Sequence, residues 1–214
     1  NNHSHDYLEA GYKDTVAALK KAGISYFGYG NRTIKTIKGI KVGLLGYKVW
    51  NESQYTRSVI QKDIKSLRTS GVKLVIVSFH WGEEGKNYPI DLQTAFGRFT
   101  VDSGADLVLG HHSHVIQSIE KYKNKYIVYS LGNFCMGGNR NPSDKDTYIF
   151  QQKFTFKDGK QVQDSINIIP CSVSSIKDRN NFQPTPLTGK DRERVINRIN
   201  EYSKDYHFKY KIEA

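Results

Sequence analysis

The sequence is poor in cysteine, which excludes two common kinds of site. Its two cysteines, Cys135 and Cys171, do not form a C-x-x-C pair, so the chain has neither a disulfide framework nor a thiolate zinc site. No apolar run approaches the roughly 18 residues that would span a membrane. There is also no signal peptide, but the chain has no starting methionine, so that absence says nothing about export.

Acidic residues are scarce relative to basic ones. The chain of 214 residues has 21 Asp and Glu against 32 Lys and Arg, a net charge of +11. A surface this basic favours polyanionic neighbours, among them nucleic acid, anionic cell-wall polymer, a membrane surface or polyglutamate. The sequence lacks recognition-helix, zinc-finger and RNP patterns, which argues against nucleic acid.

Three histidines follow one short apolar run. Residues 107–109 are a predicted buried strand that Gly110 ends, and His111, His112 and His114 come directly after it. In an α/β sheet, ligands and metals bind at the carboxyl ends of strands, and alternate residues such as His112 and His114 can converge on one centre. The alternative is a polar surface loop that happens to be rich in histidine.

Two further clusters strengthen the metal interpretation. The β-branched run 72–79 ends at His80, with Trp81 and Glu84 close behind. The first residues supply an amide, two imidazoles and a carboxylate, from Asn2, His3, His5 and Asp6. Mixed nitrogen and oxygen ligands suit zinc, manganese or iron better than calcium or magnesium.

The remaining pattern predicts a layered α/β protein. Helices are expected at residues 12–22, 53–70, 89–103 and 188–206, and strands at 24–29, 31–49 (two, around Lys38-Gly39), 72–79, 105–110, 115–122, 125–131, 147–156 and 161–170. The first helix is expected to lie over a sheet. Helix and strand alternate up to Gly110 and strands dominate afterwards, which indicates crossover connections followed by hairpins.

Four ordered motifs give the sequence a family resemblance. Residues 1–6 (NNHSHD), 80–84 (HWGEE), 110–115 (GHHSHV) and 130–134 (SLGNF) occur in the order seen in CapA-type poly-γ-glutamate capsule-synthesis proteins. These resemble the calcineurin-like metallophosphoesterases in fold, and the likeness runs to about Phe156. The resemblance implies a metallophosphoesterase-like α/β/β/α sandwich over residues 1–170, with residues 171–214 as a C-terminal extension carrying a basic helix.

The resemblance also assigns roles residue by residue. It implies metal ligands at Asn2, His80 and His114, with His111 and His112 competing for one further place and His112 favoured. It places Glu84 at the family's acidic position, and we expect Glu84 to contact substrate. His3 and Asp6 are the expected catalytic residues, with His3 as proton donor or transition-state stabiliser.

The resemblance implies a function in capsule or poly-γ-glutamate biosynthesis on the extracellular face of the cell membrane. We expect a metal-dependent, phosphoesterase-like site that holds Mn, Zn or Fe, dinuclear in the full-length protein. The family's opening Gly-Asp strand end and Asn-x-Glu motif do not occur in this chain, so we expect it to lack its N-terminal segment, to hold metal poorly and to show little or no hydrolysis. The alternative is a non-catalytic, membrane-associated scaffold that binds an acidic polymer beside synthase components.

Two candidate substrate-binding residues have plain structural alternatives. Trp81 could wall the site, but a tryptophan at a strand end is more often a core residue. Asn133 could donate to a bound anion, and it is equally well explained as a turn former. The basic C-terminal helix is most simply a solvated face, with contact to a polyanion as the other interpretation.

Overall fold

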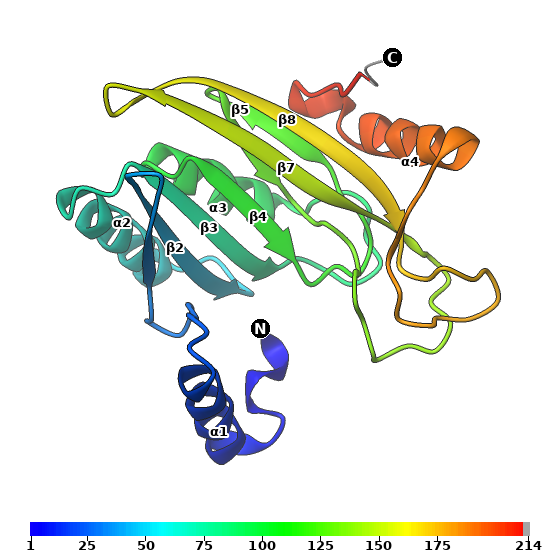
Figure 1. Cartoon of the computed structure of the whole chain (residues 1–214), viewed down its shortest axis with the longest axis horizontal. Helices are drawn as coiled ribbons and strands as arrows, with labels where there is room; N and C mark the ends of the chain where they lie inside the picture. The colour runs from blue at the N-terminus through cyan, green and yellow to red at the C-terminus, as the bar shows by residue number, and fades with distance from the viewer. Residues whose placement is uncertain (212–214) are drawn as a thin grey trace.

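The structure, a computed structural model, describes residues 1–211. In chain order its elements are η1 (Asn2–His5), α1 (Leu8–Lys21), β1 (Thr33–Ile37), β2 (Ile40–Val49), α2 (Gln54–Thr69), β3 (Leu74–Trp81), α3 (Asp91–Asp102), β4 (Leu107–His111), β5 (Ile119–Tyr122), β6 (Lys125–Val128), β7 (Asp146–Lys157), β8 (Lys160–Ser172), β9 (Thr185–Pro186), α4 (Gly189–Tyr202) and η2 (Lys204–Tyr206). Figure 1 shows them as a mixed sheet flanked by helices, with the long β7–β8 hairpin packed beside it. The predicted α/β fold class is confirmed.

The main sheet has six strands in the order β1-β2-β3-β4-β6-β5. Its four central strands are parallel, and the β1–β2 and β5–β6 hairpins close the two ends. Helices α2 and α3 make the crossovers between β2, β3 and β4, so the carboxyl ends of these strands meet at one edge. The register aligns Lys48 with His80 and His80 with His111.

Alternation along the strands divides the buried residues between two cores. Val77, Phe79 and Trp81 of β3 face α2 and α3, where they join the larger core. On β4, Val108 joins that core while Leu109 belongs to the second one. Because successive strand residues point to opposite faces, His80 lies on the face of the sheet away from α2 and α3.

The second core joins the main sheet to the β7–β8–β9 sheet and α4. Val195, Ile196 and Ile199 of α4 pack there with Tyr148 and Ile168 of β7 and β8. The helix is amphipathic, with its apolar residues at the helical spacing that the sequence predicts. The expected boundary after residue 170 falls inside β8 and stays a prediction, and residues 212–214 of the expected extension lie outside the described residues.

The N-terminal segment differs from the expectation. Helix α1 forms with Gly23 left-handed just past its end, as predicted, but none of its residues is buried. The expectation that it lies over a sheet is wrong, since in Figure 1 it stands apart from the sheet beside the N-terminus. Residues 24–29 form no strand, because only an isolated bridge joins Gly28 to Asn31. Among the described residues, no helix is both long enough and apolar enough to cross a membrane.

Candidate metal centre

The histidine-bearing segments meet at the carboxyl ends of β3 and β4. His80 is the penultimate residue of β3, and His111 ends β4 beside it. The turn after β4 carries His112 and His114, and the ring centroids of His80 and His112 lie 4.7 Å apart. These side chains border a cavity of about 1480 Å³ between the sheet edge and the N-terminal segment. The topology therefore brings together imidazoles from segments that are distant in the sequence.

Three residues offer ligand atoms to a common point. One ligand atom each from Glu84, His112 and His114 lies within 4.8 Å of the other two. Ligand atoms about 2.1 Å from one tetrahedral zinc ion lie about 3.4 Å apart, so closing the group requires a side-chain shift of up to about 1.4 Å. Glu84 is exposed and His114 Nε2 lies 3.9 Å from its Oε1, which leaves the carboxylate free to make that shift.

Hydrogen bonding and backbone conformation make the imidazoles of His112 and His114 suitable metal ligands. Asn133 Oδ1 accepts a 2.7 Å hydrogen bond from His114 Nδ1, so Nε2 of His114 carries the lone pair that faces Glu84. Nδ1 of His112 is buried and has no hydrogen-bond partner within residues 1–211. Both histidines have positive φ, 104° and 60°, a strained conformation that is concentrated at functional sites. An orphaned nitrogen and an N,N,O donor set fit a borderline divalent metal.

His80, His111 and Asn2 border this group without belonging to it. Asn2 Oδ1 accepts a 2.7 Å hydrogen bond from His80 Nε2, so these two expected ligands satisfy each other. Burial, followed by the neighbouring imidazoles, lowers the pKa of His80 well below its ordinary value of 6.5. Burial also lowers the pKa values of His111 and His112. These imidazoles are therefore neutral at pH 7, the form that binds metal.

The expected catalytic pair lies at the rim. Nδ1 of His3, on η1, is 2.8 Å from Oδ2 of Asp6, the residue that follows η1, and both side chains are exposed. His3 lines the same cavity as His112. The pair has the arrangement of an imidazole oriented by a carboxylate.

Trp81 is not at the site. Its side chain is 0% exposed, stacks on Phe79 at 4.3 Å and donates a 2.9 Å hydrogen bond to the Tyr129 carbonyl. The interpretation of Trp81 as a substrate-binding residue is wrong, because it points to the helix face while His80 points to the site. The core alternative is the correct one.

An aromatic residue that the sequence reasoning missed, Trp50, packs against the imidazoles of the site. It follows β2, is 45% exposed, and packs edge-on against His112 and His80 at centroid distances of 4.6 and 5.8 Å. The sequence did contain one signal: Trp50 comes directly after a predicted strand, just as His80 comes directly after its own.

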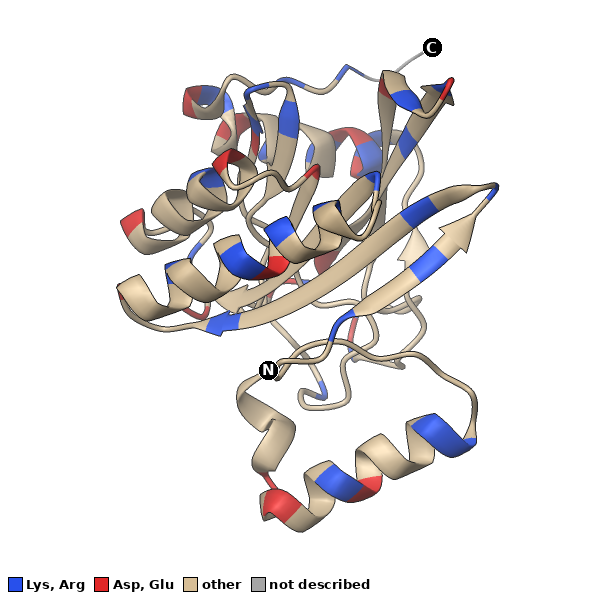
Figure 2. Ribbon diagram, turned by 90° about the vertical axis from the view of Figure 1, so that its left-hand side faces the viewer, with Lys and Arg blue, Asp and Glu red and all other residues tan. Residues whose placement is uncertain are grey.

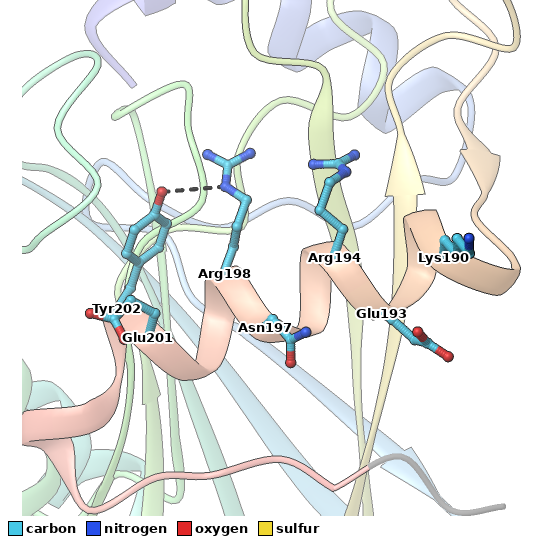
Figure 3. A pocket seen from close by; sticks show the side chains of 7 residues that line it. All are labelled: Lys190, Glu193, Arg194, Asn197, Arg198, Glu201 and Tyr202. Atoms are coloured by element: carbon cyan, nitrogen blue, oxygen red, sulfur yellow. Dashed lines mark hydrogen bonds between the residues drawn. The ribbon is translucent and has the colours of Figure 1, made fainter.

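A second hollow runs along α4, and the two arginines that line it are paired within the fold. Figure 3 shows Arg194 and Arg198 projecting from one side of the helix, with Arg198 Nε donating a hydrogen bond to the Tyr202 hydroxyl. Arg194 forms a bidentate pair with Asp146, and Arg198 binds both Asp144 and Asp146. Both guanidinium groups are therefore engaged within the fold.

Comparisons with known proteins identify the family of this chain. Residues 1–137 match the family described as "Bacterial capsule synthesis protein PGA_cap". The "Capsule biosynthesis protein CapA" of Bacillus anthracis is 32% identical, over 93% of this chain and 51% of that protein. The "PGA biosynthesis protein CapA" of Bacillus subtilis (strain 168) is 29% identical, over 100% of this chain and 58% of that protein. The chain thus spans little more than half the length of these relatives.

More distant matches add less. A "Probable polyglutamine synthesis accessory protein" of Mycobacterium tuberculosis is 30% identical over 62% of this chain and 43% of that protein. A hypothetical protein from Thermus thermophilus aligns with a TM-score of 0.47 and 13% identity over 73% of this chain and 71% of that one, which is too slight to support an argument. The family match covers all the histidine-bearing segments of the site, and on that basis the chain belongs to the PGA_cap family of bacterial capsule synthesis proteins.

Proposed function

We propose that this protein acts in capsule or poly-γ-glutamate biosynthesis through a divalent-metal site with phosphoesterase-like chemistry, on the extracellular face of the cell membrane. The observation that carries the proposal is the convergence of Glu84, His112 and His114 at the carboxyl edge of the main sheet. Its capsule role is supported by membership of the family and by the names of the Bacillus relatives.

Glu84, His112 and His114 would hold the cation, with His80 as the nearest further imidazole. When bound, a manganese, zinc or iron ion supplies Lewis acidity toward a phosphoryl or carbonyl oxygen and makes water a better nucleophile at neutral pH. Glu84 contributes the negative charge that a set of imidazoles and Asn2 lacks. Asn133 fixes the tautomer of His114, as outer-shell partners of metal ligands do.

His3 is the proposed proton donor. The carboxylate of Asp6 holds Nδ1 of His3, so the other ring nitrogen is the one that exchanges a proton with substrate. Trp50 packs edge-on against His112 and would help to hold that imidazole in place.

The second candidate function is a non-catalytic scaffold that binds an acidic polymer beside membrane-bound synthase components. The observation that favours it is the net charge of +11. On this alternative the metal site is structural, and substrate turnover is absent while metal binding persists.

Calorimetric titration of Mn²⁺ and Zn²⁺ tests the metal site. We expect the chain to bind one equivalent, and His112→Gly to weaken binding by about 10- to 100-fold or more, because it removes a ligand. His207→Gly is the matched control, since His207 is an exposed imidazole that also has positive φ. Equal binding by both variants would contradict the assignment. Assays on phosphoester and amide test substrates with Mn²⁺ or Zn²⁺ then separate enzyme from scaffold, because the enzyme predicts turnover that His112→Gly loses and the scaffold predicts none.

A further inference from the structure

Acidic residues are absent from one long stretch of the chain. Residues 15–51 contain no Asp or Glu, whereas they contain seven cationic residues: Lys20, Lys21, Arg32, Lys35, Lys38, Lys41 and Lys48. Five of the seven lie on or next to the β1–β2 hairpin, which forms one end of the main sheet. Figure 2 shows this hairpin with blue segments and no red ones.

The charges of this hairpin are available to a partner. Arg32, Lys35, Lys38, Lys41 and Lys48 are all exposed, and within residues 1–211 none of them forms a salt bridge. Arg32 donates to Ser66 Oγ at 2.7 Å and Lys41 to the Ser70 carbonyl at 3.3 Å, and both acceptors are neutral. The positive charge is therefore not neutralised by the fold, in contrast to that of Arg194 and Arg198 on α4.

The hairpin leads to the candidate metal centre. Lys35 pairs with Val42, and Lys48 pairs with His80. Paired residues share a face, and so do residues an even number apart on one strand, so Lys35, Lys48 and His80 lie on the same face of the sheet. The stretch of β2 from Val42 to Lys48 spans roughly 20 Å. Lys48 also lines the cavity that contains His112.

The side chains here fit carboxylates better than nucleic acid. The hairpin lysines, which we define as Lys35, Lys38 and Lys48, are compact point charges on flexible stems. Lys41 is left out of this set because it lies on the opposite face of β2, where its Nζ donates to the Ser70 carbonyl. The β1 strand and its turn carry no aromatic side chain on which a base could stack. The exposed apolar residues of the hairpin are Ile34 and Ile37.

We propose that the β1–β2 hairpin is a binding surface for a linear polycarboxylate, which runs along the hairpin lysines and reaches the metal centre at Lys48. This inference rests on the proposed function, since it names the polymer that the site would receive and the surface that delivers it. Each exposed ion pair is weak, so binding requires several of them together and is screened by salt over about 8 Å at physiological ionic strength.

The test is binding of fluorescein-labelled poly-γ-glutamate at low ionic strength, followed by fluorescence anisotropy. The variant Lys35→Glu/Lys38→Glu reverses two charges beside the Lys38-Gly39 turn. The control Lys157→Glu/Lys160→Glu makes the same charge change at exposed residues that flank the Asp158-Gly159 turn of the other long hairpin. We expect about tenfold weaker binding for the first variant and little change for the control.

Other outcomes overturn the proposal. Equal losses of affinity in both variants would show that net charge alone drives binding. Unchanged affinity in both would show that the hairpin does not bind the polymer. A single-stranded DNA of equal charge that binds as tightly, with the same loss, would contradict a polycarboxylate surface. Manganese titration of the same proteins separates the two proposals: His112→Gly loses metal and Lys35→Glu/Lys38→Glu retains it, so either claim can fail while the other stands.

Discussion

At the scale of single residues, Gly110 lets the histidine strand approach its neighbours. A Cβ there would lie 1.9 Å from the Tyr129 carbonyl oxygen and 2.5 Å from Trp81 Nε1, the two atoms of a buried hydrogen bond. We expect Gly110→Ala to lower the free energy of unfolding by about 3 kcal/mol, because backbone cannot yield as a flexible side chain can. Urea denaturation measures this. Gly137→Ala is the control, since nothing lies within 4 Å of its added Cβ, and equal stability of the two variants would refute the packing account.

Residue roles could be predicted where they follow from strand ends and local spacing. The carboxyl-end position of His80, His112 and His114 is a consequence of short apolar runs, and the sequence contains those runs. The period-two alternation that separates His80 from Trp81 was also available in the sequence. The grouping of Glu84 with two imidazoles could not be predicted from the sequence, because it depends on how the loop after β3 turns toward the loop after β4. Trp50 was missed because its place beside His112 depends on β2 lying next to β3.

At the scale of elements, ion pairs join α4 to β7: Arg194 and Arg198 of the helix both bind the carboxylate of Asp146 on the strand. Burial alone would raise the pKa of Asp146, but hydrogen bonds from Arg194 and Arg198 hold it below its ordinary value of 3.8. Because the pKa is lower in the folded state, this stabilisation is present above the unfolded pKa and is lost as the pH falls through the folded one. The ion pairs of Asp146 with Arg194 and Arg198 should therefore stabilise the folded protein at neutral pH, and this stabilisation should be lost only in acid.

The variant Asp146→Asn tests this link. The Asp146 side chain is 8% exposed while Arg194 is half exposed, so we expect a loss of about 2 kcal/mol at pH 7 that shrinks as the pH falls below the ordinary carboxyl pKa of 3.8. Asp191→Asn removes an exposed partner of Arg194 and should change the unfolding free energy by less than about 0.5 kcal/mol. A loss that is independent of pH in urea denaturation would show that the carboxylate's charge is not what holds α4.

Elements with local signals were predicted well. The turns Lys38-Gly39, Lys123-Asn124 and Asp158-Gly159 each join two antiparallel strands, and all six residues have positive φ. Helix α2 begins after Ser53, whose side chain caps it. The segment 24–29 was mistaken for a strand, because its apolar residues satisfy the pattern while no neighbouring strand pairs with them.

At the scale of the whole molecule, the α/β class followed from the rhythm of helices and strands, but the arrangement did not. The strand order β1-β2-β3-β4-β6-β5 and the placing of β7 and β8 against the opposite face depend on contacts between distant segments. Net charge was plain from composition, yet its location was not. Arg194 and Arg198 of α4 are engaged by Asp144 and Asp146, whereas the basic residues of the β1–β2 hairpin form no salt bridge within residues 1–211.

The central claim is that Glu84, His112 and His114 hold one divalent cation, and anomalous X-ray scattering tests it most directly. A crystal of the protein grown with Zn²⁺ is measured on both sides of the zinc absorption edge. We expect one strong anomalous peak about 2.0–2.2 Å from an imidazole nitrogen of His112, from Nε2 of His114 and from a carboxylate oxygen of Glu84. A zinc peak held only by other residues, or none at the carboxyl edge of β3 and β4, would contradict the account.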